Sequence, residues 1–197
     1  MLDRPSLTVG ATSIRVFKRT DTGNVAPQRV IAGSNTGLAG NAQALALDST
    51  NGELVVTNTQ TNTVLVFKTS DSGNPSPTRT ISGPMTGLNL PVGVYVDPLN
   101  NEIGVVDAFT GNAVTVYLRT ANGNVAPLRT ISGPSTLLNQ PVEIALDPLH
   151  DEIFVVNVGT FGVPTLSEWG QIVMVTLLVV GGLLALRRRS VVSGRLG

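Results

Sequence analysis

The residues most able to do chemistry in this chain are carboxylates that recur at a regular spacing. Three of them close short apolar segments about 50 residues apart: Asp48, Asp97 and Asp147. A fourth, Asp107, has Asn58 and Asn157 as its counterparts in the neighbouring repeats. Oxygen ligands of this kind, gathered around one axis, would suit a divalent cation. Asx side chains also cap turns, and we favour capping because Pro or Asn-Gly turn residues follow the recurrent aspartates.

The single histidine offers little for catalysis. His150 lies in DPLHDE, at the position of Asn100 in DPLNNE and Asn51 in DSTNGE. A position shared with turn residues predicts an exposed turn histidine, and no Ser-His-Asp triad can be assembled around it. The chain has no cysteine, which removes thiolate metal sites and a cysteine nucleophile. We therefore predict no catalytic, cofactor-binding or metal-ligating residue and no cofactor.

Composition indicates an all-β protein. Charged residues make up 13% of the chain, and 21 Gly and 12 Pro punctuate segments rich in Val, Thr and Ile. The net charge is zero, but residues 1–163 hold 9 Lys and Arg against 12 Asp and Glu. A mildly acidic body without a basic stripe argues against nucleic acid as a partner.

The recurrent residues belong to a repeat with a period of 50 residues. It is plainest in the stretches VFKRTDTGNVAPQRVIAG from Val16, VFKTSDSGNPSPTRTISG from Val66 and VYLRTANGNVAPLRTISG from Val116. Between them recurs a strand–turn–strand pattern such as GVYVDPLNNEIGVVD. Each unit thus predicts four short antiparallel strands, the size of one β-propeller blade. The fold expected is a partial β-propeller of about three four-stranded blades, followed by one C-terminal transmembrane helix.

The repeats divide residues 1–158 into complete and incomplete units. The expected parts are a blade remnant at 7–33, blades at 42–83 and 92–133, and a half-blade at 142–158. In the second complete unit the expected strands are 92–96, 102–106, 113–119 and 128–132. The remnant would supply strands at 7–9, 13–19 and 28–32, and the half-blade strands at 142–146 and 152–157. One arginine per unit falls on the outermost strand, and we interpret Arg29, Arg79 and Arg129 as solvated charges that protect a sheet edge.

The spacing GNxxPxRxIxG, followed by LDP and EIxVV, resembles the repeats of NHL-like and lactonase-like β-propeller proteins of the six- or seven-bladed type. The resemblance covers roughly residues 7–158 and implies the propeller fold. It leaves the activity open, because such scaffolds include binding, structural and enzymatic members.

The blade count does not close a ring, because propellers typically need ~4 to 8 blades. Either further repeats lie upstream of this sequence, or copies of the chain self-associate to complete the propeller; an open array is the third alternative. The segment MLDRPSLTVGAT also lacks the features of a signal peptide. We favour a truncated start, which predicts further 50-residue repeats and a signal peptide encoded upstream.

The end of the chain differs from the repeats. Residues 172–186 carry no charge, and a helix of the 18 residues 169–186 would cover ~27 Å of a bilayer core of ~30 Å. We expect a transmembrane helix at 171–186 in the lipid bilayer, stopped by Arg187, Arg188 and Arg189 and followed by a cytoplasmic tail at 190–197. An amphipathic or buried helix is the alternative, but Thr176 is the only polar residue of 172–186.

After a linker at 159–162, residues 163–189 resemble the IPTL-CTERM type of bacterial protein-sorting tail. The motif residues are Val163, Pro164, Thr165, Leu166, Trp169 and Gly170, with Val163 in place of the leading Ile. The resemblance implies export to a Gram-negative cell envelope. It also implies a single pass through the inner membrane with the propeller on the periplasmic side, and processing by an exosortase-like membrane peptidase that releases or displays the body.

Three functions follow from different classes of protein. We favour a non-enzymatic, envelope-associated propeller that serves as a binding or scaffold module. The alternatives are a metal-dependent, lactonase-like hydrolase and a truncated gene product without independent function. The preference rests on the regularity of the repeats, since no residue departs from them as a grafted active site would.

Overall fold

The computed structural model describes residues 12–38, 40–108 and 111–159. The chain divides into two units, Met1–Gly159 and Thr160–Gly197, and all described residues belong to the first. The expected strand at 7–9 and the expected transmembrane helix at 171–186 lie outside the described residues. None of the helices that are described has the length and apolar character needed to cross a bilayer.

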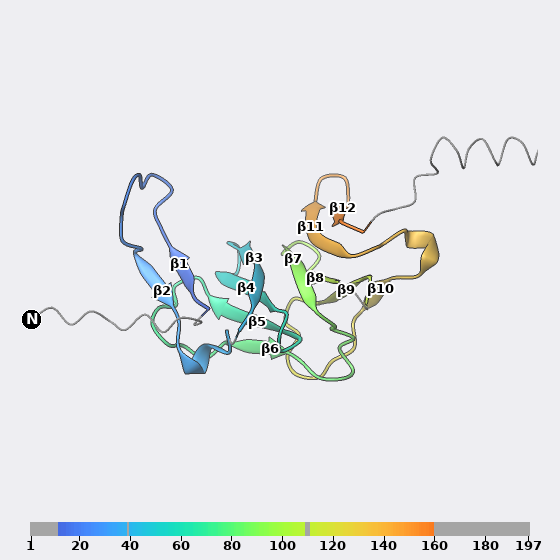
Figure 1. Ribbon diagram of the computed structural model, residues 1–197, viewed down its shortest axis with the longest axis horizontal. Helices are drawn as coiled ribbons and strands as arrows, with labels where there is room; N and C mark the ends of the chain where they lie inside the picture. Colours follow the sequence, from blue (N-terminus) through green and yellow to red (C-terminus); the bar gives the residue numbers. More distant parts are fainter. Residues whose placement is uncertain (1–11, 39, 109–110, 160–197) are drawn as a thin grey trace, which may run out of the picture. The chain divides into compact units, whose positions relative to one another are not determined.

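Two four-stranded antiparallel sheets form the centre of the first unit (Figure 1). The first contains β3 (Ala42–Asp48), β4 (Glu53–Asn58), β5 (Thr63–Lys68) and β6 (Arg79–Ile81), paired in chain order. The second contains β7 (Pro91–Asp97), β8 (Glu102–Asp107), β9 (Ala113–Leu118) and β10 (Arg129–Ile131) in the same order. The predicted unit of four consecutive antiparallel strands is confirmed in both sheets.

Each end of the first unit carries a two-stranded sheet. β1 (Ile14–Val16) pairs with β2 (Arg29–Ile31), and these strands align with the third and fourth strands of a complete sheet. β11 (Pro141–Asp147) pairs with β12 (Glu152–Asn157), and these align with the first and second strands. Short 3-10 helices, η1 (Ser34–Thr36) and η2 (Pro134–Thr136), follow β2 and β10.

One predicted strand is much shorter than expected. The sequence favours a strand at 13–19, but β1 contains three residues, Ile14–Val16. Its counterpart β5 contains six, because it pairs along its whole length with β4 and over three residues with β6. Strand length in this repeat is therefore set by the neighbouring strand on both sides.

The middle strands are buried on both faces. The residues after Glu53 in β4 and after Glu102 in β8 are all buried. Most of them are hydrophobic, such as Val55 and Val56 of β4 and Val105 and Val106 of β8. β3 and β11 pack against the two sides of β7, and one core cluster joins Val55 and Val66 of the first sheet to Val94 and Val105 of the second. Near-continuous apolar segments are what strands covered on both faces require.

Consecutive sheets are joined at their outer edges by a parallel bridge. Gly73, in the turn between β5 and β6, bonds β2 through its N–H to Val30 O at 2.7 Å and its carbonyl to Ala32 N at 2.8 Å. Gly123 of the next sheet bonds β6 in the same way. Both glycines have φ near +75°, at 73° and 77°, a conformation that L side chains rarely adopt. The repeated Gly-Asn turn is thus the joint between sheets.

Side-chain volumes compensate across the first two strands of each unit. Tyr95 lies opposite Gly104, and a Cβ on Gly104 would collide with the Tyr95 ring. In the other units the opposed pairs are Ala46 with Val55 and Ala145 with Phe154. In each of these three units one large residue therefore lies opposite one small residue. The large residue is on the first strand in the unit of Tyr95 and on the second strand in the other two.

Substitution of this pair tests the compensation. Gly104→Val should destabilise the protein by about 1–3 kcal/mol, because the added methyls overlap the buried Tyr95 ring. In a Tyr95→Ala background the same change should stabilise, because valine then fills the space as Val55 does. Urea unfolding of the four proteins of this cycle measures both effects. A Gly104→Val change of the same sign in both backgrounds would show that the two residues do not share the site.

Candidate functional site

The recurrent aspartates are used inside their own turns. Asp48 Oδ1 accepts a hydrogen bond from Asn51 N at 2.9 Å, and its Oδ2 accepts one from Asn51 Nδ2 at 2.7 Å. Asp97 accepts equivalent bonds from Asn100 N and Nδ2, and a further one from Leu99 N at 2.9 Å. The predicted turn capping by these side chains is confirmed.

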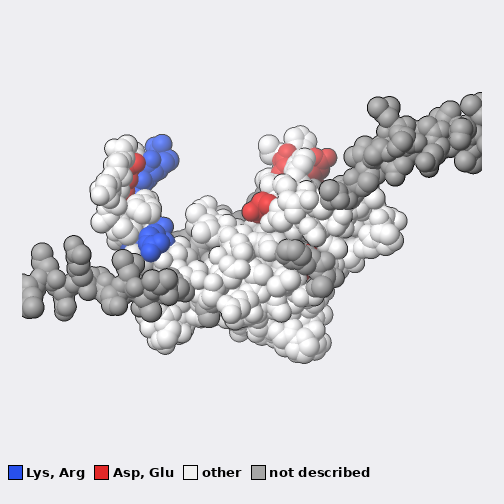
Figure 2. All heavy atoms as spheres, in the orientation of Figure 1, with Lys and Arg blue, Asp and Glu red and all other residues white. Residues whose placement is uncertain are grey.

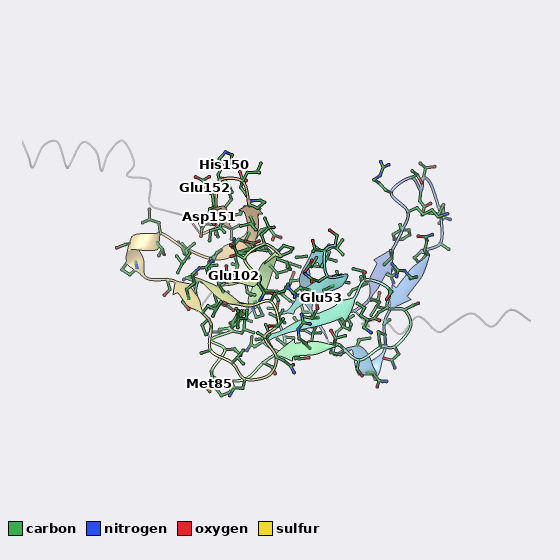
Figure 3. The ribbon with its side chains drawn as sticks, turned by 180° about the vertical axis from the view of Figure 1, so that it is seen from behind. Glu53, Met85, Glu102, His150, Asp151 and Glu152 are labelled. Atoms are coloured by element: carbon green, nitrogen blue, oxygen red, sulfur yellow. The ribbon has the colours of Figure 1, made fainter. Side chains whose placement is uncertain are left out.

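His150 occupies the same position in the last turn. Its Nδ1 lies 2.7 Å from Asp147 Oδ2, and its side chain is 70% exposed. The hydrogen bonds from His150 and from Leu149 N–H lower the pKa of Asp147. The predicted exposed turn histidine is confirmed, and Figure 3 shows it beside Asp151 and Glu152 in the connection between β11 and β12.

Asp107 is buried, as are Asp48 and Asp97, but its hydrogen-bond partners lie outside its own turn. Asn89 N donates to its Oδ1 at 2.8 Å, and Thr115 Oγ1 donates to its Oδ2 at 3.1 Å. Burial outweighs these bonds and raises the pKa of Asp107 to about 6. Its counterpart Asn58 carries no charge and donates from Nδ2 to Gly37 O at 2.9 Å. Within the described ranges no three His, Cys, Asp or Glu side chains are grouped as metal ligands.

An ion-pair cluster connects the two complete sheets. Arg79 of β6 binds Glu53 of β4 in bidentate fashion, at 2.7 Å from Nη1 to Oε1 and 2.9 Å from Nη2 to Oε2. Arg119, which follows β9 in the next sheet, donates from Nη1 to Glu53 Oε2 at 2.7 Å. The Glu53 side chain is 14% exposed, and the hydrogen bond from Arg79 is the main cause of its lowered pKa.

The prediction of solvated edge charges is wrong for Arg29 and Arg79, which are partly buried, whereas Arg129 is an exposed charge on the outermost strand β10. Arg79 Nη2 also donates to Arg119 O of the next sheet at 3.0 Å, and Arg29 Nη1 donates to Thr69 O at 2.6 Å. Arg129 binds Glu102 in bidentate fashion with its side chain 53% exposed. Arg79 and Arg129 each reach across one intervening strand to a glutamate of their own sheet. The bidentate contact forms because the planar guanidinium group matches the geometry of a carboxylate.

Sequence reasoning missed the glutamates that hold these arginines. Glu53, Glu102 and Glu152 recur directly after each Asx turn, and the arginines recur with the same period. Opposite charges at fixed positions in every repeat were the available signal.

A hollow of about 540 Å³ lies between the second sheet and the β11–β12 hairpin. Its lining includes Tyr95, Glu102, Arg129, Leu146 and Asp151. Burial raises the pKa of the Tyr95 hydroxyl. Across the equivalent position between the first and second sheets, Arg119 reaches over to Glu53. The hollow is thus at the position that corresponds to the joint filled by Arg119.

The predicted sorting residues lie outside the described residues: Val163, Pro164, Thr165, Leu166, Trp169, Gly170, Arg187, Arg188 and Arg189. The family comparison bears on them directly, since the model of the IPTL-CTERM motif matches residues 161–190. The chain carries an IPTL-CTERM motif. The matched range includes all nine residues and extends the resemblance to the whole segment. No curated protein matches the chain.

Solved structures match about two thirds of the chain. The Kuenenia stuttgartiensis hydrazine synthase matches with a TM-score of 0.51 and 16% identity, over 68% of this chain and 34% of that chain. The WD40 repeats of RRP9 match with a TM-score of 0.45 and 12% identity, over 67% of this chain and 42% of that chain. This chain therefore spans less than half the length of either structure. At such identities the likeness concerns the fold alone, which is β-propeller-like; the NHL-like or lactonase-like subtype stays a prediction.

The buried Asp107 makes stability depend on pH in a defined sense. Its folded pKa of about 6 lies above the ordinary value of 3.8, so the folded state binds the proton more tightly, and stability falls as pH rises from about 4 to about 6. Asp107→Asn should remove that decline and stabilise the protein at pH 7 by up to about 3 kcal/mol. Unfolding at pH 4 and pH 7 measures it; a destabilised Asp107→Asn protein at pH 7 would contradict the account.

The cluster at Glu53 has the opposite pH dependence. Its folded pKa lies below the ordinary 4.5, so its stabilising effect is present above that pH and is lost as pH falls through the folded pKa. Glu53→Gln should cost about 2 kcal/mol at pH 7 and progressively less in acid. Arg119→Met should cost about 1 kcal/mol, and the double variant less than the sum, because the charges interact.

Lys68→Gln is the matched control for Glu53→Gln. Lys68 is the exposed cross-strand neighbour of Glu53 in β5, and its loss should change stability by less than about 0.5 kcal/mol. Equal effects of Glu53→Gln and Lys68→Gln would show that the cluster does not join the sheets.

Proposed function

We propose that this protein is an exported, envelope-associated β-propeller that acts as a non-enzymatic binding or scaffold module. Its C-terminal segment would deliver it: residues 171–186 enter the inner membrane, with the propeller on the periplasmic side and residues 190–197 in the cytoplasm. An exosortase-like membrane peptidase then removes the basic end. The IPTL-CTERM match at 161–190 carries this proposal.

The described carboxylates support a role without chemistry. Asp48, Asp97 and Asp147 cap turns, and Glu53 and Glu102 bind arginines. A hydrolytic metal site would need several of these oxygens turned to a common point. No contact in the described part of the chain favours the lactonase-like alternative over the scaffold.

Processing at the C-terminus tests the delivery step. The full-length gene is expressed in a Gram-negative host that contains an exosortase-like peptidase, and the mature C-terminus is determined by mass spectrometry. We expect a mature chain that lacks Arg187–Arg189, and accumulation of the uncut form in Pro164→Ala. Val192→Ala, outside the matched segment, is the control and should be cut normally. An intact arginine-rich end on the wild-type protein would defeat the proposal.

A further inference from the structure

The outer edge of the second sheet lacks the cover that the preceding edges have. Ile31 of β2 and Ile81 of β6 are 1% and 0% exposed, because the Gly73 and Gly123 turns pair with their strands. Ile131 of β10 occupies the same repeat position and is 38% exposed. No such turn pairs with β10 among the described residues.

The same edge also has a socket, at Gly133, where the earlier repeats hold an asparagine side chain and where no described residue lies. Asn74 fits against Gly33 and accepts a hydrogen bond from Asn35 N at 2.8 Å. Asn124 fits against Gly83 and accepts one from Met85 N at 2.8 Å. A Cβ on Gly133, the third member of the series, would meet no described atom within 4 Å. The β10 edge therefore has the form of a receptor for a Gly-Asn turn.

A Gly-Asn turn that could pair with the β10 edge lies at the other end of the repeats, between β1 and β2. The connection between β1 and β2 contains Gly23 and Asn24, the counterparts of Gly73 and Asn74, and Asn24 is exposed. Phe17 is 48% exposed, whereas its counterparts Phe67 and Tyr117 are fully buried. Val25 is exposed, whereas Val125 packs against the core cluster that joins the two complete sheets. These residues are shaped for burial that the described residues do not provide.

β12 presents the second half of the same interface. Its Phe154 and Val156 are 56% and 54% exposed, whereas Val55 and Thr57 at the same positions of β4 are buried beside β5. A third strand of the β5 type would cover them. β1 aligns with β5 and lacks a β4-type partner among the described residues.

The β1–β2 and β11–β12 hairpins carry opposite charges. Residues 12–32 hold four cations, Arg15, Lys18, Arg19 and Arg29, against one acid, Asp21. Residues 134–159 hold no Lys or Arg and four acids, Glu143, Asp147, Asp151 and Glu152. Figure 2 shows the cations over the β1–β2 hairpin and the acids over the β11–β12 hairpin. Opposite patches of this kind favour association with a fixed register.

From these surfaces we infer that a second copy of this chain completes the last sheet. β1 and β2 of one copy pair beside β12 of the other, giving the order β11-β12-β1-β2, while the Gly23–Asn24 turn covers Ile131 and fills the socket at Gly133. The register of β4 with β5 places Phe154 opposite Val16 and Ile153 opposite Phe17.

The same superposition assigns the charges. Arg19 takes the position of Arg119 and reaches Glu102, as Arg119 reaches Glu53. Arg29 takes the position of Arg79 and reaches Glu152, as Arg79 reaches Glu53. Arg19 thus enters the hollow beside Arg129.

Two reciprocal contacts close the assembly. The described residues of each copy contribute two complete sheets, and each of the two junctions forms one more, so these residues give six sheets in the dimer. That number lies within the ~4 to 8 blades of closed propellers. A head-to-tail contact closes after two copies when each is turned by half a revolution about the ring axis.

Directed disulfide formation tests this interface, because the chain has no native cysteine. Differently tagged full-length chains carrying Val16→Cys or Phe154→Cys are mixed in mild detergent and oxidised, and the mixed disulfide is measured on non-reducing gels. We expect the mixed dimer to be the main product, since opposed antiparallel residues satisfy disulfide geometry. Val155→Cys in place of Phe154→Cys is the control. Its side chain points to the other face of the strand and should give little product.

A charge swap tests the assigned pair. Arg19→Glu in the Val16→Cys chain should reduce the mixed disulfide about tenfold, and Glu102→Arg in the Phe154→Cys chain should restore it. Equal yields from Phe154→Cys and Val155→Cys, or no mixed product, would overturn the inference, as would an intramolecular bond in a chain carrying both cysteines. These outcomes do not depend on C-terminal processing, so the inference can fail while the delivery proposal stands.

Discussion

The architecture depends on the joint between consecutive sheets, where a Gly-Asn turn of one sheet pairs with the outermost strand of the sheet before it. The outermost strand is only three residues long, so it could not hold the next sheet by itself. Two backbone hydrogen bonds at Gly73 or Gly123, one asparagine oxygen on a backbone N–H and a buried isoleucine act together there. The positive φ of the glycine lets its N–H and carbonyl both face the neighbouring strand. Where the joint is made, the edge is buried; at β10 no described residue makes it, and Ile131 is 38% exposed.

Charged groups reinforce this joint, and that use limits what else they can do. Glu53 holds one arginine of its own sheet and one of the next, and Arg79 also bonds a carbonyl of the next sheet. Asp48, Asp97 and Asp147 accept hydrogen bonds from nitrogens three residues or fewer away, and Asp107 accepts bonds from Asn89 N and Thr115 Oγ1. The polar residues of the repeat are thus committed to turns and joints. This distribution suits a scaffold whose specificity comes from surfaces between and beyond the sheets, and it is the reason that the proposed function contains no reaction.

Prediction from sequence was most successful where a residue's role is local or repeats along the chain. The turn-capping aspartates and exposed His150 follow from short-range hydrogen bonding, and β12 occupies the expected residues 152–157 because strand and turn signals agree there. The interpretation of Arg29 and Arg79 as solvated charges failed because their partners lie far along the chain, 26 residues away in the case of Glu53 and Arg79 and 40 in the case of Arg29 and Thr69 O. Periodicity says that such residues matter, but it does not say which of them meet.

The sequence by itself determined the strand order, the period of 50 residues, the incomplete units at both ends and the IPTL-CTERM motif, because each is written in residues close together or equally spaced. Only the tertiary structure decided which repeat-equivalent residues are buried. Phe17, Phe67 and Tyr117 are equivalent in sequence, yet the first is 48% exposed and the others are fully buried. Burial depends on the strand that lies alongside, and a repeat cannot specify whether that neighbour belongs to the same chain.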